Sequence, residues 1–292
     1  MEEKKLKIGI PKGSLQEHTF KIFELAGFNI QLLPRSYILL FDDPEIEGFL
    51  LRPQEIPRYL EDGKLDLGIS GDDWIVETEA EVVEICDLRY AKQKIKKVKW
   101  VLAVPKDSKV ESIRALKGKI ISTEIVNIVQ NYLKKNKVKA KVEFSFGATE
   151  VKPPRFADAI IDLIETGASL EAHNLKILDT VFESSTKLIA NKNSWENPWK
   201  KEKIKELALL LKGAVESEKI TGIFMHVHKN KLEETLKTLT APAKPTVTRI
   251  PDTDLYDVFF VEDDKKTRDM IPKLKRMGCE AIVEFPLSKM VV

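Results

Sequence analysis

The sequence predicts an α/β protein with mainly parallel strands, followed by a smaller C-terminal domain of a different kind. Two observations support this fold class. Units of an apolar strand, a polar turn and a helix recur along the first part of the chain. Residues 219–292 instead have the order β-α-β-β-α-β, which is typical of a ferredoxin-like domain. Ligands of parallel sheets bind beyond the carboxyl ends of the strands, so the polar turns are the expected places for a site.

The expected elements of the first part indicate two lobes. They are strands at 6–10, 65–69, 100–104, 157–164 and 186–192, and helices at 15–25 and 199–211. The composition changes around residues 92–105, where a run of lysines favours a solvated edge strand over an anion funnel. We therefore expect a first lobe of residues 1–95 and 183–213, a second lobe of residues 96–182 and the C-terminal domain at 219–292.

Length and composition exclude several classes of protein. With 292 residues, 43% of them apolar, the chain is long enough for two or three domains with their own cores. No apolar run approaches the ~20 residues of a membrane span, and the N-terminus has no apolar signal-peptide region. The net charge of +2 predicts no nucleic-acid partner. Two distant cysteines, Cys86 and Cys279, favour a reduced, cytoplasmic setting over a disulfide framework.

The stretch ADAIIDLIETGASLEAHNL, residues 157–175, changes character at its centre. Its first half is apolar apart from Asp158 and Asp162, which are four residues apart and so share one face of a strand. A Gly-containing turn between a strand and a helix presents free N–H groups, and Thr166 and Ser169 add hydroxyls, so the turn suits a phosphate monoester. The carboxylates then bind ribose hydroxyls or Mg²⁺, or they form a strand-end pair bonded to neighbouring loop amides. The spacing favours neither interpretation.

The four histidines give no metal pattern. His18, His173, His226 and His228 lack the spacing of zinc ligands, so no zinc site is predicted. His226 and His228 are two residues apart on an expected strand and share a face, where they either line a ligand pocket or face the solvent.

Several segments together resemble one enzyme family. "DAIIDLIETGASLEAHNL" resembles the phosphoribosyl diphosphate motif of the ATP phosphoribosyltransferases, which catalyse the first step of histidine biosynthesis. "KIGIPKGSL" is similar to the family's opening strand and loop, and "LRPQEIPRYLEDGKLDLGISGDDWIVE" to its Arg-Pro…Ile-Pro…Asp-Leu-Gly-Ile-x-Gly-x-Asp block. "ISTE", "GATE" and the C-terminal "LKRMGCEAIVEFPLSKMV" resemble later parts of the family's long form, in the same order.

The resemblance implies a fold and a reaction. Two α/β lobes similar to periplasmic binding proteins are expected to enclose a central cleft, and the C-terminal domain is expected to be regulatory. The implied reaction joins N1 of the adenine of ATP to C1′ of 5-phosphoribosyl 1-diphosphate and releases pyrophosphate, with Mg²⁺ as the cofactor. Histidine is the implied inhibitor, and a homo-oligomer, either a dimer or a hexamer, is the implied assembly.

The resemblance also assigns roles to residues of the phosphoribosyl site. Thr166, Gly167, Ala168 and Ser169 are expected to hold the 5-phosphate. Asp158 and Asp162 are expected to hold the ribose hydroxyls, directly or through Mg²⁺. The family usually has Thr where Ser169 stands, which keeps the hydroxyl, and Ser or Gly where Glu165 stands. Because a carboxylate next to a phosphate departs from this pattern, Glu165 is expected to point outward.

A second set of residues is expected around ATP and the leaving pyrophosphate. Its members are Lys12, Gly13, Ser14, Arg52, Ser70, Gly71, Asp72, Glu124 and Glu143. Lys12 and Asp162 are the expected catalytic residues. Many members of the family have Arg where Ser14 stands, so the contacts of this loop with the anion are expected to differ in this chain. A surface ion pair for Arg52 and an ordinary helix cap at Ser70, Gly71 and Asp72 are the competing interpretations. His226 and Thr246 are expected in the histidine site from their positions alone.

Two other functions remain open from the sequence. A two-lobed small-ligand sensor or binding protein shares the expected fold, although the missing signal peptide argues against a solute receptor. Another phosphoribosyltransferase shares the turn and its upstream acids, whereas the first-lobe segments favour the enzyme that uses ATP.

Overall fold

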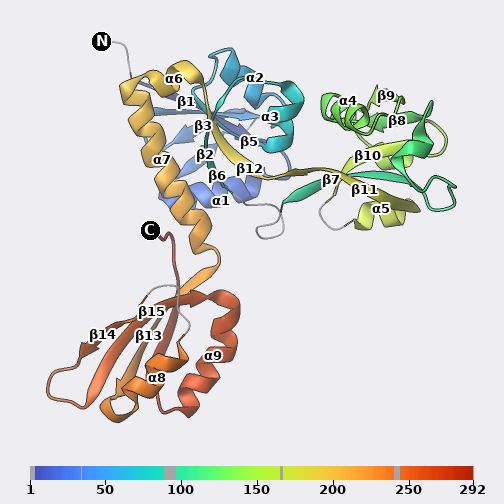
Figure 1. The fold of residues 1–292 in the computed structure, drawn as a ribbon. Coiled ribbons are helices and arrows are strands. Elements are labelled where there is room, and N and C mark those ends of the chain that lie inside the picture. The colour runs from blue at the N-terminus through green and yellow to red at the C-terminus, as the bar shows by residue number, and fades with distance from the viewer. Residues whose placement is uncertain (1–3, 34, 89–96, 165–166, 240–243, 292) are drawn as a thin grey trace. The chain divides into compact units, whose positions relative to one another are not determined.

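A computed structural model describes residues 4–33, 35–88, 97–164, 167–239 and 244–291. It confirms the expected α/β class, because the described strands form three sheets that are joined by helices (Figure 1). The chain divides into one compact unit that runs to Ala208 and a second that consists of Leu25–Gly27 and Leu209–Val292.

The first sheet has seven strands, and its order places a late strand among early ones. The order is β2 (Ile30–Leu32), β3 (Ile38–Phe41), β4 (Ile46–Leu51), β1 (Leu6–Pro11), β5 (Leu67–Gly71), β12 (Thr186–Ala190) and β6 (Val83–Asp87). β1 is parallel to β4 and β5, whereas β12 runs antiparallel between β5 and β6. The helices of this part are α1 (Gln16–Ala26), α2 (Ile56–Glu61), α3 (Asp72–Thr78), α6 (Lys192–Glu196) and α7 (Pro198–Ser217). The carboxyl ends of β1, β4 and β5 therefore lie at one edge of the sheet.

The second sheet has five strands, all formed by residues 98–184. Their order is β11 (Leu175–Ser184), β7 (Val98–Pro105), β10 (Ala159–Ile164), β8 (Ile120–Thr123) and β9 (Lys141–Phe144). The helices here are α4 (Val126–Lys135) and α5 (Ala168–Ala172), with 3₁₀ turns η1 (Ile113–Leu116) and η2 (Thr149–Val151). Val129 and Leu133 of α4 belong to the core on one face together with Trp100, whereas Leu170 of α5 packs in a separate core cluster with Val101.

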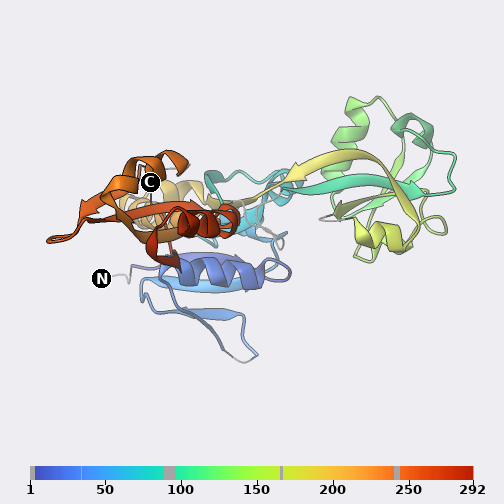
Figure 2. The same ribbon diagram turned by 90° about the horizontal axis from the view of Figure 1, so that it is seen from below.

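Two segments connect the first two sheets. β7 and β11 pair antiparallel, and β11 leads through Ser185 alone into β12 of the first sheet. Figures 1 and 2 both show β7 beside the segment that runs from β11 to β12. Ser184 and Ser185 therefore lie where the chain passes from the second sheet into the first. We call this place the crossing of the two sheets.

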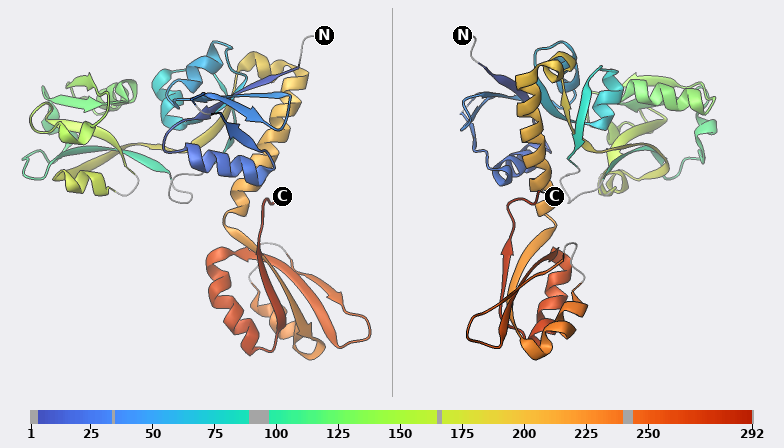
Figure 3. Two further views of the ribbon diagram at one scale, coloured as in Figure 1. Left: turned by 180° about the vertical axis from the view of Figure 1, so that it is seen from behind. Right: turned by 60° about the vertical axis from the view of Figure 1, so that its left-hand side comes forward.

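The third sheet confirms the expected ferredoxin-like order. It is antiparallel, with the strand order β14 (Thr246–Arg249), β15 (Leu255–Asp263), β13 (Ile220–His228) and β16 (Glu280–Pro286). α8 (Leu232–Thr238), which follows the short turn η3 (Lys229–Lys231), and α9 (Asp264–Arg276) cover one face (Figure 3). Leu236 and Leu274 from these helices pack on Ile223 and Met225 of β13.

Two element ends differ from the sequence expectation. The strand expected at 186–192 ends at Ala190, because the side chain of Asn191 accepts a hydrogen bond from the N–H of Ser194 and caps α6.

The helix expected to end at residue 211 continues to Ser217, through Gly213. The N–H of Met290 donates to the carbonyl of Gly213 (2.9 Å), and a Cβ at Gly213 would lie 3.1 Å from the carbonyl oxygen of Met290. Gly213 therefore allows a close approach of the chain and does not end the helix.

An ion pair with a buried carboxylate and a partly exposed lysine holds α7 to the first sheet. The Asp66 carboxylate is almost fully buried and accepts from the N–H of Lys7 (2.8 Å), the hydroxyl of Ser194 (2.6 Å) and the ammonium of Lys200 (2.6 Å).

Lys200→Met keeps the aliphatic stem but leaves this carboxylate without its cation. We expect the free energy of unfolding to fall by about 2–4 kcal/mol in urea titrations followed by circular dichroism. The exposed Lys205, which pairs with Glu202, is the matched control.

Lys205→Met should change the free energy of unfolding by no more than about 0.5 kcal/mol, because exposed helix pairs contribute little. Equal losses in the two variants would contradict a special role for the Asp66–Lys200 pair.

Candidate active site

Two cations follow neighbouring parallel strands. Pro11 of β1 pairs with Leu51 of β4, so the next residues, Lys12 and Arg52, lie at the same carboxyl edge. The N–H of Lys12 donates to the carbonyl of Leu51 (2.6 Å), which fixes the start of the loop. Gly13 then turns the chain toward α1 with φ +104°, a conformation that favours glycine.

A small acidic cavity lies next to this loop. It measures about 200 Å³ and is lined by Ser14, by Ser184 and by the carboxylates of Asp73, Glu124 and Asp162. Its described lining residues include no lysine or arginine. Burial is the main cause that raises the pKa of each of the three carboxyl groups.

A second cavity adjoins the acidic one. It measures about 720 Å³, and its lining includes Arg52, Arg58 and the rings of Tyr59, Phe144 and Phe146. The two cavities share three lining residues, which are Gln54, Trp74 and Glu124. A chamber lined by carboxylates therefore borders one that offers two guanidinium groups and aromatic faces.

Asp162 lies inside β10, where the sheet partly removes it from water. Burial, with smaller effects of the nearby Glu150 and Glu124, raises its pKa to about 6. The N–H of Leu163 donates to its Oδ1 (2.9 Å), and the charge of Lys152 partly offsets the rise. Asp162 is consequently a carboxyl group whose charge changes close to neutral pH.

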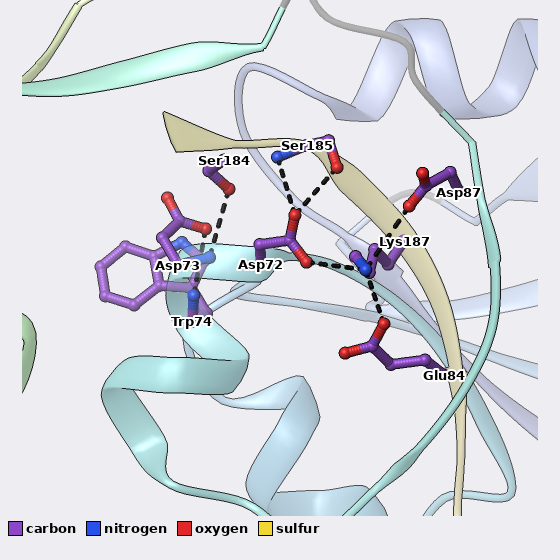
Figure 4. A network of polar contacts seen from close by, with 8 residues as sticks. All are labelled: Asp72, Asp73, Trp74, Glu84, Asp87, Ser184, Ser185 and Lys187. Atoms are coloured by element: carbon purple, nitrogen blue, oxygen red, sulfur yellow. Dashed lines mark hydrogen bonds and ion pairs between the residues drawn. The ribbon is translucent and has the colours of Figure 1, made fainter. Parts of the chain in front are cut away.

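Asp73 is a buried acid that the sequence analysis did not select. Its Oδ2 accepts from the indole N–H of Trp100 (2.7 Å), and its Oδ1 from the N–H of Trp74 (3.0 Å). Its own N–H donates to the hydroxyl of Ser184 (3.2 Å) at the crossing of the two sheets (Figure 4). The signal was present, because Asp73 is the last residue of the Gly-x-Asp block, one position after the selected Asp72.

The helix-start turn expected at Ser70, Gly71 and Asp72 is shorter than predicted. β5 continues through Ser70 and Gly71, and α3 begins at Asp72. Ser70 is buried and donates from its hydroxyl to the carbonyl of Pro53 (2.8 Å). Gly71 lines the acidic cavity, where an added Cβ would lie 2.1 Å from Oδ1 of Asp73. A residue with a side chain at position 71 would therefore displace the Asp73 carboxylate, whereas glycine leaves room for it.

The Asp72 carboxylate belongs to a network at the crossing of the sheets. It accepts from the hydroxyl of Ser185 (2.9 Å) and pairs with the ammonium of Lys187 (3.1 Å), which also reaches Glu84 and Asp87 (Figure 4). Burial acts against the charge of Lys187, but its bonds to Glu84 and Asp72 outweigh burial and raise its pKa. In this structure Asp72 supports the crossing and does not line either cavity.

The described part of the phosphate turn follows β10. Gly167 has φ +81°, and α5 begins at Ala168. The hydroxyl of Ser169 donates to Oε1 of Glu150 (2.6 Å), a residue of the "GATE" segment that was not selected from the sequence. That hydrogen bond is the main reason for the lowered pKa of Glu150. Glu165 and Thr166 lie outside the described residues.

The carboxylate of Asp158 does not lie beside that of Asp162. β10 begins one residue after Asp158, at the end of the strand opposite to the phosphate turn. The Asp158 carboxylate accepts from the N–H of Ile120 (2.9 Å) and from the ammonium of Lys119 (3.0 Å). The bond from Ile120 is the main cause of its lowered pKa. For this residue the structure matches the alternative of a strand-end acid bonded to a neighbouring amide.

The two glutamates expected near ATP are separated. Glu124 lines both cavities, whereas Glu143 on β9 forms an ion pair with Lys141 (2.6 Å) and lines neither.

Lys152 was missed by the sequence analysis; its ammonium donates to the hydroxyls of Ser122 (3.0 Å) and Ser145 (2.5 Å). Its charge also partly offsets the rise in the pKa of Glu124. Lys152 is therefore a fixed cation near the acidic cavity.

The two residues expected in a histidine site lie on one face of the third sheet. His226 is opposite Asp257 on β15, and Thr246 is opposite Phe259, two residues further along the same strand. Nε2 of His226 lies 3.2 Å from Oδ1 of Asp257, without the geometry of a hydrogen bond. Both residues are on the face opposite to the core that α8 and α9 cover.

The described residues contain no group of three or more His, Cys, Asp or Glu side chains that could hold a metal ion. No helix within the described ranges is long and apolar enough to cross a membrane.

The fold and the site define a class of protein: an α/β enzyme of two sheets that places an acidic chamber next to a chamber with cations and aromatic rings. Sequence comparison is more specific. Residues 52–213 match the family described as ATP phosphoribosyltransferase, and residues 217–289 match the family described as "HisG, C-terminal domain". The chain belongs to the ATP phosphoribosyltransferase family, whose members are pentosyltransferases that require a divalent metal ion.

Individual relatives agree with this assignment along the whole chain. The ATP phosphoribosyltransferase of Thermodesulfovibrio yellowstonii is 48% identical over 291 residues, which is 100% of both chains. That of Solibacter usitatus is 51% identical over 287 residues, covering 98% of this chain and 99% of the relative. Among solved structures, the ATP phosphoribosyl transferase (HisG:HisZ) complex from Thermotoga maritima matches with a TM-score of 0.62 and 28% identity, over 72% of this chain and 98% of that one.

Proposed function

We propose that the chain transfers the 5-phosphoribosyl group of 5-phosphoribosyl 1-diphosphate to N1 of the adenine of ATP and releases pyrophosphate. This reaction is the first step of L-histidine biosynthesis. The observation that carries the proposal is the 48% identity to the T. yellowstonii enzyme along the full length of both chains. The two adjoining cavities support it, because two unlike substrates must meet in one place.

We assign the phosphoribosyl group to the acidic cavity and to the turn around Gly167. In this assignment Thr166, Gly167, Ala168 and Ser169 hold the 5-phosphate, and Asp162 faces the ribose. Asp158 is left out, because its carboxylate is bonded at the opposite end of β10.

We assign ATP and the leaving pyrophosphate to the edge with Lys12, Gly13, Ser14 and Arg52, and to the second cavity. Glu124 lines both cavities and so belongs where the substrates meet. Ser70, Gly71 and Asp72 shape the neighbouring end of β5, whereas Glu143 is a more distant member of the set.

The chemistry of the transfer suits these side chains. Displacement at C1′ develops positive charge on the ribose, which an ionised carboxylate such as that of Asp162 stabilises. The departing pyrophosphate gains negative charge, which the ammonium of Lys12 neutralises. Because the two cavities adjoin, binding brings the two substrates next to each other, so that much of the entropy cost of the reaction is met on binding.

Mg²⁺ is the divalent ion that we propose for this enzyme. It prefers carboxylate and phosphate oxygens and is usually held by one or two carboxylates together with substrate phosphates. Asp162 and Glu124 fit this requirement, because both carboxylates line the acidic cavity. When bound, the ion supplies positive charge next to the leaving pyrophosphate.

A direct assay tests the reaction. Purified protein with ATP, 5-phosphoribosyl 1-diphosphate and MgCl₂ is expected to form phosphoribosyl-ATP, followed by its absorbance, only when both substrates are present. Ribose 5-phosphate in place of the diphosphate is the control, because it lacks the leaving group. Binding without turnover would instead indicate a two-lobed sensor, and turnover with another base a different phosphoribosyltransferase.

We propose three domains with a cytoplasmic location. A first lobe of residues 1–95 and 183–213 is supported by the seven-stranded sheet, in which β12 joins early strands. A second lobe of residues 96–182 is supported by the five-stranded sheet, and a domain of residues 219–292 by the antiparallel sheet. A reduced cytoplasm suits the two cysteines, which are not joined in a disulfide.

A homo-oligomer, either a dimer or a hexamer, is part of the proposal. The face of the third sheet opposite to α8 and α9 carries Phe224, Phe259 and Phe285. The rings of Phe259 and Phe285 stack at 6.1 Å, above Gly222, where an added Cβ would lie 2.6 Å from the ring of Phe285. Such an aromatic surface supports contact between copies of the chain.

Histidine is the proposed inhibitor, bound by the domain at 219–292. Because this domain is separate from the catalytic residues, histidine can act only by binding one arrangement of the protein better than another. We expect calorimetry to detect heat on addition of histidine, and inhibition that saturating ATP does not fully overcome. Alanine is the control ligand, because it lacks the imidazole that would interact with His226 and Thr246. Normal catalysis with no heat at millimolar histidine would restrict this domain to assembly.

A further inference from the structure

Three neighbouring strands of the first sheet bring a third side chain to the edge that holds Lys12 and Arg52. β3 runs antiparallel to β4, so the residue before β3 lies at the same edge as the residue after β4. That residue is Tyr37, whose carbonyl accepts from the N–H of Leu50 (2.7 Å). Across the strands β3, β4 and β1, the edge therefore carries a phenol, a guanidinium and an ammonium group.

The phenol contacts the ammonium directly. Nζ of Lys12 donates to the hydroxyl oxygen of Tyr37 (3.0 Å) and lies 4.3 Å from the centre of its ring. Tyr37 is itself well exposed, so the contact lies at the surface of the loop region. Among the described residues, no acceptor is recorded for the phenolic proton. Tyr37 thus accepts one hydrogen bond from Lys12 and keeps its own O–H free to donate.

The charges of the two cations reach the phenol. The hydrogen bond from Lys12, followed by the charge of Lys12 and a smaller effect of Arg52, lowers the pKa of Tyr37. The phenol is therefore a group whose titration reports whether these two cations are neutralised by a bound anion.

We propose that Tyr37 positions Lys12 for a substrate polyphosphate and donates its own hydroxyl proton to one of the phosphate oxygens. The proposal rests on the assignment of Lys12 and Arg52 to the polyphosphate. A free lysine side chain has many rotamers, and fixing its ammonium next to Arg52 before the substrate arrives removes part of that entropy loss from binding. The site is then a set of three donors, from three adjacent strands, for a di- or triphosphate chain.

Tyr37→Phe tests the hydroxyl, because it keeps the ring over Lys12. The loss of a hydrogen bond to a charged oxygen is expected to raise KM for ATP or for 5-phosphoribosyl 1-diphosphate about tenfold, with less than about a twofold change in kcat. Tyr132→Phe is the matched control, because Tyr132 loses a bond to Asp179 away from both cavities. Equal KM values for wild type and Tyr37→Phe would overturn the proposal.

A second experiment needs no turnover, and so separates this inference from the proposed reaction. The protein carries tyrosine labelled with ¹³C at Cζ, and the signal lost in Tyr37→Phe identifies Tyr37. In the wild type, inorganic pyrophosphate is expected to raise the pKa of this phenol, because the anion offsets Lys12 and Arg52. Lys12→Ala should raise the same pKa without any ligand. Pyrophosphate that binds by calorimetry but leaves the Tyr37 titration unchanged would overturn the proposal, whether or not phosphoribosyl-ATP is formed.

Discussion

Asp162→Asn is expected to lose activity and gain stability at the same time. The variant removes a charge-assisted contact to the ribose, so kcat/KM should fall about 10- to 100-fold. The wild-type carboxyl group has a pKa of about 6 in the folded chain, mainly because it is buried, so ionisation at pH 8 weakens the fold. Asparagine avoids that loss and can still accept the hydrogen bond from the N–H of Leu163.

The pH dependence gives the sign of each effect. Activity of the wild type is expected to fall as the pH drops through about 6, because the ionised form is the active one. A carboxyl group whose folded pKa is raised makes the wild type more stable as the pH falls from about 6 toward 4. The stability gain of Asp162→Asn should therefore be about 1–3 kcal/mol at pH 8 and should disappear near pH 4.

Asp158→Asn is the matched control for stability. The pKa of Asp158 is lowered, first by its bond from Ile120, so its ionised form stabilises the fold and its removal should give no gain at pH 8. Urea titrations at pH 8 and pH 4 measure both variants, and kcat/KM profiles measure the activity. Near wild-type kcat/KM in Asp162→Asn would mean that the phosphoribosyl site lies elsewhere.

Removal of divalent cations is expected to abolish turnover without unfolding the protein. The acidic cavity is lined by three carboxylates and, among its described lining residues, by no lysine or arginine. A pyrophosphate group that enters it meets like charge, and Lys12 and Arg52 at the neighbouring edge, even with Lys152 close to the cavity, are too few to neutralise the leaving group alone. Turnover in EDTA should be undetectable and should return with excess MgCl₂.

Two controls make the chelation experiment specific. EDTA already saturated with Mg²⁺ should leave turnover unchanged, which separates chelation from direct inhibition by EDTA. Circular dichroism should show the same spectrum with and without EDTA, because the proposed ion is held by one or two carboxylates together with the substrate phosphates. Full activity in EDTA would contradict the proposed role of Mg²⁺.

The sequence was sufficient for the fold class, because strand–turn–helix units and the β-α-β-β-α-β order depend on local patterns. Boundaries were less accurate where a distant contact decides them. The helix expected to end at residue 211 continues as α7 to Ser217, and its Gly213 lies close to the backbone of Met290. Ser70 looked like part of a turn, yet its hydroxyl bonds to the carbonyl of Pro53 within a continuous strand. Neither contact can be read from neighbouring residues.

The candidate site was only partly predictable for a related reason. Spacing placed Asp158 and Asp162 on one face, but the strand starts after Asp158, whose carboxylate is taken by Ile120. Asp73 was overlooked because its partner Trp100 is 27 residues away in the sequence. Tyr37 was overlooked because its place beside Lys12 depends on the order of three strands, which the sequence did not give. The motif identified the loops, whereas pairing across sheets decided which side chains meet.

The position of β12 between β5 and β6 has a consequence for synthesis of the chain on the ribosome. The first sheet still lacks this internal strand while residues 98–184, which form the second sheet, are being synthesised. About 100 residues separate the end of β6 from the start of β12, so translation leaves this gap open for roughly 5–20 seconds. During that time the edge of β5, whose residues are all buried in the finished sheet, has unpaired N–H and carbonyl groups. The nascent chain is then exposed to wrong strand pairing at β5, and a chaperone that binds extended apolar segments would have its target there.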